Sequence, residues 1–168
     1  MKKLILILMI LTASLSAINA VSCASADEVE YYIICKPGGE INIRERPKVR
    51  SPIVGCLCFG DKVISDGIEA NGFIHVIDLA AEVWDGWIYK GLLVEDRPVQ
   101  TEGKAQVFNA GKVACRKYAS TDSKVKKWLK DGKEVEIYAI SEKWCVTEYG
   151  YIKTEFLTVN AKVWESEN

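Results

Sequence analysis

The chain has 168 residues, of which 49% are hydrophobic and 27% charged, and its formal net charge is −1. This composition excludes a disordered or fibrous class and leaves room for one medium domain or two small ones. The nearly neutral charge gives no indication of a nucleic-acid partner.

The first segment predicts export. Two lysines precede an apolar run over residues 4–11, and small residues follow as far as Ala26. These three parts are typical of a secretory signal peptide, and the apolar run is too short for a membrane span. We therefore predict a signal peptide over residues 1–26 and a secreted or envelope-associated protein outside the cytoplasm. In a second interpretation, the sequence Ala-Val-Ser-Cys makes Cys23 the lipid-anchored first residue of a lipoprotein.

The rest of the chain matches itself when it is shifted by 72 residues, without a gap for more than thirty positions. Ile41-Asn42-Ile43-Arg44 aligns with Val113-Ala114-Cys115-Arg116, and Gly60-Asp61-Lys62-Val63 aligns with Gly132-Lys133-Glu134-Val135. Such a repeat indicates two copies of one structural unit. The paired arginines occupy the same place in both copies. We expect them to be structural, with a ligand carboxylate as the alternative partner.

Each copy consists of short segments rich in Val, Ile, Tyr and Trp, separated by turn signals such as Asp66-Gly67 and Asp131-Gly132. Beyond residue 26, no stretch has a persuasive helical stripe of apolar residues. Closely spaced short strands predict an all-β fold of two tandem small barrels, with about five strands each. We place the first domain at residues 27–96, a linker at 97–104, and the second domain with a C-terminal tail at 105–168.

The first copy resembles the bacterial SH3 domains (SH3b). The resemblance lies in Ile41-Asn42-Ile43-Arg44, Pro47, Gly60-Asp61-Lys62-Val63, Phe73-Ile74-His75-Val76 and Gly86-Trp87-Ile88, and it covers nearly all of residues 30–95. The second copy matches less closely. The resemblance implies SH3-like barrels and a non-catalytic binding module of the kind often attached to cell-wall hydrolases. It also implies a peptidoglycan peptide or another wall component as the ligand.

Catalysis and metal binding have little support in the sequence. His75 is the only histidine and lies in a predicted strand, so we expect a structural or surface role. Cys56 and Cys58 lie two residues apart, which is not the usual spacing of a zinc site. We therefore predict no enzyme activity, no metal and no cofactor. Cys35 is the natural disulfide partner for Cys56 or Cys58, although an odd number of cysteines beyond residue 26 leaves one thiol free.

Aromatic and basic side chains near loops are the best candidates for ligand contact, with core packing as the competing explanation. Trp128 has five lysines around it, which fit either an acidic polymer or a solvated strand that protects a sheet edge. Trp87 and Trp144 are expected in the core. The predicted ligand-binding residues are Arg46, Trp84, Tyr118, Trp128 and Tyr149.

The sequence therefore predicts an exported binding module that recognises a peptidoglycan peptide or an envelope protein. It predicts no nucleic-acid partner and no membrane span. The alternative is a structural or adaptor protein at the cell envelope, or an accessory targeting partner of a wall hydrolase.

Overall fold

A computed structural model describes residues 28–77, 85–108 and 111–163. The predicted signal peptide, Cys23 and Trp84 lie outside these ranges. The described part contains fourteen β-strands and two short 3-10 turns, so the predicted all-β class is confirmed. Within these ranges no helix has the length and apolar character needed to cross a membrane.

The first module is a seven-stranded antiparallel sheet with the strand order β3-β2-β6-β5-β4-β1-β7. Its 3-10 turn, η1 (Lys90–Leu92), leads directly into β7. Its strands are β1 (Val29–Ile33), β2 (Glu40–Arg44), β3 (Ile53–Cys58), β4 (Lys62–Ala70), β5 (Phe73–Ile77), β6 (Asp85–Tyr89) and β7 (Leu93–Val94).

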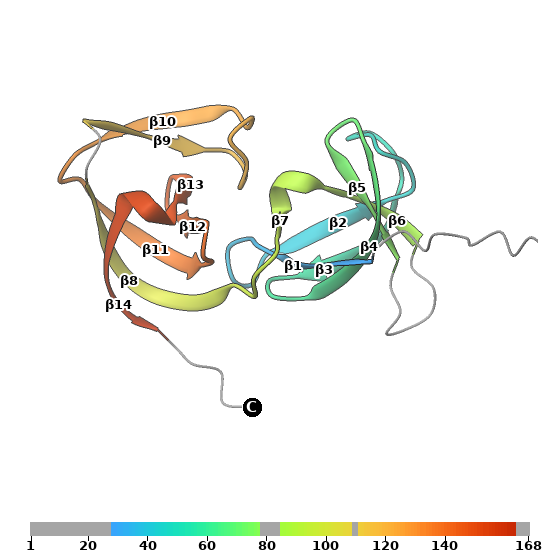
Figure 1. Cartoon of the computed structure of the whole chain (residues 1–168), viewed down its shortest axis with the longest axis horizontal. Helices are drawn as coiled ribbons and strands as arrows, with labels where there is room; N and C mark the ends of the chain where they lie inside the picture. Colours follow the sequence, from blue (N-terminus) through green and yellow to red (C-terminus); the bar gives the residue numbers. More distant parts are fainter. Residues whose placement is uncertain (1–27, 78–84, 109–110, 164–168) are drawn as a thin grey trace, which may run out of the picture.

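The second module repeats this sheet, with the order β10-β9-β13-β12-β11-β8-β14. Its turn η2 (Thr154–Phe156) again precedes the last strand. Its strands are β8 (Val99–Val107), β9 (Lys112–Arg116), β10 (Val125–Lys130), β11 (Glu134–Ile140), β12 (Trp144–Thr147), β13 (Gly150–Lys153) and β14 (Leu157–Val163). The two modules lie side by side (Figure 1).

The strand order is the same in both modules, as the repeat in the sequence requires, but two details of the prediction were wrong. Each sheet has seven strands instead of about five. Within the described residues neither sheet closes into a barrel, because β3 and β7 end one sheet and β10 and β14 end the other.

Alternation along each strand places one face inside. In β9, Val113 and Cys115 are buried, whereas Lys112, Ala114 and Arg116 point to the other face. This period of two is the pattern expected for a sheet with one buried face and one face exposed to solvent.

The predicted linker at residues 97–104 is mostly strand. From Val99 onward it belongs to β8, which pairs with both β11 and β14. The connection between the modules is therefore confined to residues 95–98, between the end of β7 and the start of β8. A connection this short limits how far the modules can move apart.

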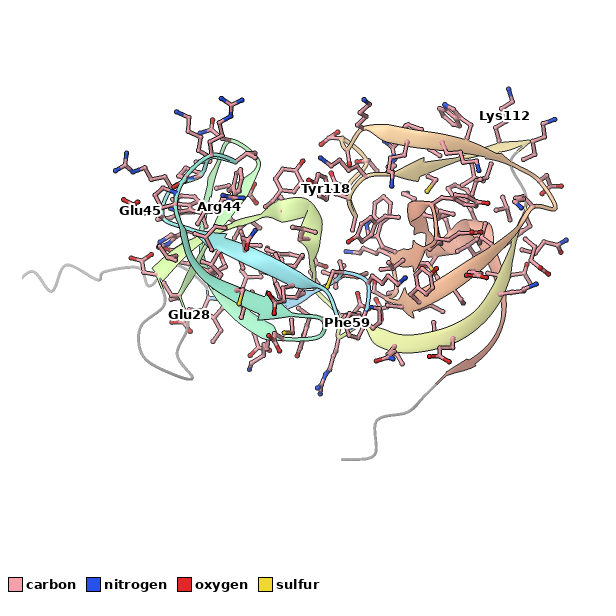
Figure 2. All side chains as sticks on the ribbon, turned by 180° about the vertical axis from the view of Figure 1, so that it is seen from behind. Glu28, Arg44, Glu45, Phe59, Lys112 and Tyr118 are labelled. Carbon is pink, nitrogen blue, oxygen red and sulfur yellow. The ribbon has the colours of Figure 1, made fainter. Side chains whose placement is uncertain are left out.

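Three groups of buried side chains hold the molecule together. One fills the first module, one fills the second, and the third lies between them. The third group joins Ile34 and Val94 of the first module to Ala119, Trp144 and Tyr151 of the second. Figure 2 shows Tyr118 and Phe59 at this junction. Burial of each large apolar side chain contributes about 1.5–3 kcal/mol. Because both modules supply side chains to the third group, they form one packed body.

Candidate binding site

A groove of about 770 Å³ runs along the junction of the two modules. We call it the inter-module groove. Strands and loops of both modules line it, including η1 with β7 on one side and β12 with the loop after β9 on the other. Its lining residues are Tyr31, Glu69, Gly72, Lys90, Leu93, Val94, Glu95, Ala119, Ser120, Thr121, Asp122, Glu142, Lys143, Trp144, Lys153 and Glu155.

The floor of the groove is apolar and belongs partly to the packed junction and partly to the core of the first module. Leu93, Val94 and Ala119 are each less than a tenth exposed, and Trp144 is 7% exposed. The Trp144 backbone N–H donates to Ser141 Oγ over 3.1 Å, which fixes the start of β12. The floor therefore offers an apolar surface whose shape the packed core determines.

The rim of the groove carries charges of both signs. Lys143 Nζ lies 2.7 Å from Glu95 Oε2, which joins the second module to the end of the first. This hydrogen bond raises the pKa of Lys143. Lys90 pairs with Glu69 on one wall. Exposed ion pairs of this kind contribute little to stability. A ligand that carries charges of both signs can therefore replace the partners in these pairs at little cost.

Buried polar contacts fix the two walls relative to each other. The hydroxyl of Tyr151 donates to the carbonyl of Ile34 over 3.0 Å, and burial raises the pKa of this tyrosine. The Ala119 N–H donates to the carbonyl of Gly91 over 2.8 Å. A β-carbon added to Gly91 would lie 2.7 Å from Cβ of Tyr118, so only glycine permits this close approach. The groove is therefore preformed by the fold.

A second hollow of about 500 Å³ lies against β8 and β11. Of the described residues of the first module, Lys36 and Pro37 line it. The Lys36 ammonium already lies 4.1 Å from the centre of the Tyr138 ring. Because its aromatic surface already has a cation, this hollow is the weaker candidate.

The structure separates the residues predicted to bind a ligand. Arg46 is exposed in a loop of the first module and pairs with Glu45. Tyr118 lies at the junction with its ring centre 4.6 Å from that of Tyr89, so it packs between the modules. The backbone N–H groups of Arg46 and Tyr118 each donate to a serine Oγ over 3.0 Å, which shows the two loops to be equivalent.

Trp128 and Tyr149 lie in the second module but belong to different environments. Trp128 is 59% exposed on the edge strand β10. Tyr149 packs against the core, with the Lys127 ammonium 3.6 Å from its ring centre. Neighbouring residues of a strand point to opposite faces. Tyr149, which lies against Lys127, is therefore on the opposite face from Trp128. Trp84 lies outside the described residues.

The paired arginines are structural, as expected. Arg44 Nη1 donates to the carbonyl of Ser51, and Arg116 Nη1 donates to the carbonyl of Ser123, both over 2.8 Å. Each guanidinium thus closes the loop between the second and third strands of its module.

His75 lies between two carboxylates on the outer side of the first sheet. Its Nδ1 contacts Asp66 Oδ2 at 2.7 Å, its Nε2 contacts Asp85, and its ring packs against Trp87. Burial lowers the pKa of His75, but the hydrogen bonds to the two carboxylates outweigh it and the pKa is raised. Both ring nitrogens are engaged, so the imidazole has a structural partner on each side.

The five cysteines of the described part are free thiols. The expected pairing of Cys35 with Cys56 or Cys58 does not form, because alternation along β3 points both of these side chains to solvent while Cys35 is buried. Burial raises the pKa of Cys35 to about 11 and that of Cys145 to about 12. In the described ranges no three or more His, Cys, Asp or Glu side chains are arranged so that they could hold a metal ion.

Sequence patterns did not indicate the groove. Trp144 was assigned to the core and is nearly buried, yet its remaining surface forms part of the groove floor. Leu93 and Ser120 were not named as candidate site residues, because each becomes part of a site only when the modules dock.

Comparison with known proteins gives limited further information. No protein-family model matches the chain, and no curated protein matches it. Among solved structures, NlpC2 from Trichomonas vaginalis is 20% identical, with a TM-score of 0.34 over 80% of this chain and 49% of that one. NlpC1 from the same organism is 19% identical, with a TM-score of 0.35 over 83% of this chain and 48% of that one.

The chain therefore spans about half the length of the solved structures it matches. At these TM-scores the likenesses establish neither a shared fold nor a shared activity.

Proposed function

We propose that this protein is an exported, non-catalytic binding module that holds a short peptide in the inter-module groove. The single observation behind the proposal is the preformed groove itself, with an apolar floor and a rim of mixed charge. Ligand sites of this kind combine a concave apolar surface with a few placed polar groups. A peptide that carries both carboxylate and ammonium groups matches such a rim.

The peptide component of peptidoglycan is the ligand we favour. It is short, it carries charges of both signs, and it is found outside the cytoplasm, where residues 1–26 would direct the chain. We also propose that each module is an SH3-like (SH3b) unit. The matching strand orders and the equivalent arginine-closed loops support this view.

Retention on purified peptidoglycan tests the proposal. Thr121 is exposed and lines the groove, so Thr121→Trp fills the groove without removing a core contact. The matched control is Val49→Trp, since Val49 is the residue 72 positions earlier, is 69% exposed and does not line the groove. We expect Thr121→Trp to weaken retention by about tenfold or more, which corresponds to about 1.4 kcal/mol. Val49→Trp should bind like the unmodified chain.

Two results would contradict the proposal. In the first, the unmodified protein stays in the supernatant at low salt. In the second, both tryptophan variants bind equally well, which would mean that the groove is not the site. Either result would leave the alternative of a structural or adaptor protein at the envelope.

A further inference from the structure

The outer face of β9 and β10 carries an unusual combination of side chains. Pairing with β9 places Trp128 and Lys130 of β10 on this face, with Lys112 and Ala114 of β9 beside them, and the exposed Lys126 lies at a break in register two residues before Trp128. The register sets Lys130 opposite Lys112 and Trp128 opposite Ala114. We call this set of five residues the basic patch. Because alanine is small, it leaves the flank of the indole uncovered.

The fold does not demand this composition. In the first module the same backbone positions, 72 residues earlier, hold Glu40, Asn42, Val54, Cys56 and Cys58. Over residues 111–133 the chain has eight basic and two acidic residues, whereas residues 39–61 have four and three. Two sheets of the same strand order thus differ strongly in charge on this face.

Protection of a sheet edge explains the lysines but not the tryptophan. Charged residues on an edge strand prevent pairing with another chain. A tryptophan that is 59% exposed has the opposite effect, because it offers apolar area to a partner. All three lysines of the basic patch are exposed, and the lysine ion pairs of the described ranges involve Lys62, Lys90, Lys104, Lys143 and Lys153 instead.

We propose that the basic patch binds an anionic glycan. A flat indole accommodates the apolar face of a sugar ring, and its N–H remains free to donate at the rim. Lys130, two residues after it along β10, lies about 7 Å away on the same face. Lys126 lies on its other side along the strand, at the break in register. The lysines then contribute charge-assisted hydrogen bonds to carboxylate, phosphate or sulfate groups. This site is separate from the inter-module groove and shares no residue with it.

A heparin-derived oligosaccharide is the probe, because it combines sugar rings with negative charges. Polyglutamate supplies charge without sugar, and dextran supplies sugar without charge. We expect the affinity for the oligosaccharide to exceed that for either comparison polymer, and to fall as salt is added.

Matched variants distinguish binding at the basic patch from binding through the net charge of the protein. Lys126→Ala with Lys130→Ala removes two charges from the patch, and Lys62→Ala with Lys104→Ala removes two charges elsewhere. Trp128→Ala removes the ring from an exposed position. The first pair and Trp128→Ala should each weaken oligosaccharide binding by about tenfold, and the control pair by no more than about twofold.

Three outcomes would overturn the proposal. Equal losses in both lysine pairs would mean that the association is unspecific. Unchanged binding in Trp128→Ala would exclude stacking on the ring. Stronger binding to polyglutamate would assign the patch to an acidic peptide. A circular dichroism spectrum that matches the unmodified protein establishes for each variant that the sheet is intact.

Discussion

The hydrogen bond between Tyr151 and Ile34 should determine how tightly the two modules are coupled. The hydroxyl donates over 3.0 Å to a carbonyl of the other module, and Tyr151 and Ile34 are 8% and 0% exposed. Tyr151→Phe removes only the hydroxyl and leaves the ring in the junction. The carbonyl of Ile34 then loses this donor in a place with little access to water.

The expected cost follows from the burial of that carbonyl. A buried acceptor that loses its partner costs about 1–3 kcal/mol, and the phenyl ring keeps its packing, so we expect a loss of about 1.5 kcal/mol in the free energy of unfolding. For a chain of this size, the melting temperature should fall by about 3–6 °C.

Urea unfolding followed by fluorescence and by circular dichroism measures this effect. The unmodified protein should unfold in one transition, because the shared buried group couples the modules. Tyr151→Phe should lower the urea midpoint, and the transitions followed by fluorescence and by circular dichroism should begin to differ. Tyr149→Phe is the matched control in the same module, and we expect its free energy of unfolding to change by less than about 0.5 kcal/mol.

Unfolding of Tyr151→Phe and Tyr149→Phe at the same urea concentration would contradict a stabilising role for this hydrogen bond. Two separate transitions in the unmodified protein would contradict coupling of the modules. Either result would show that the junction contributes little to stability, and the inter-module groove would then have no fixed walls.

Two further predictions concern the junction and the histidine. Gly91→Ala places a methyl group against Cβ of Tyr118 and should destabilise the protein by about 1–3 kcal/mol, measured by thermal unfolding; an unchanged melting temperature would contradict the close approach. The raised pKa of His75 means that its pairs with Asp66 and Asp85 stabilise the fold fully below about pH 6.5 and that this contribution is lost as pH rises through the folded-state pKa. Unfolding between pH 6 and 8 should show a slope of at most about 1.4 kcal/mol per pH unit that His75→Asn removes; an equal slope in both proteins would exclude the histidine as its source.

Local sequence patterns determined much of the fold. Alternating apolar residues and glycine-led turns act over a few residues, and both copies contain them in the same order. Gly60 and Gly132 each adopt positive φ in equivalent turns, a conformation that favours glycine. What could not be foreseen was the number of strands, since β7 is only two residues long and β8 begins in a segment that looked like a linker.

Only the tertiary structure decided what each aromatic residue does. Tryptophan and tyrosine serve equally well in a core, at a junction or on a surface, so their identity and spacing do not separate these roles. Docking of the modules buried Trp144 and Tyr151 and placed Tyr118 between the sheets, whereas the position of β10 at a sheet edge left Trp128 in solvent. The sequence by itself determined that the chain holds two copies of one succession of short strands and turns, because that information is local. The groove depends on contacts between residues far apart in the sequence, and the basic patch depends on which side chains of β9 and β10 remain exposed. Only the folded chain defines these two properties.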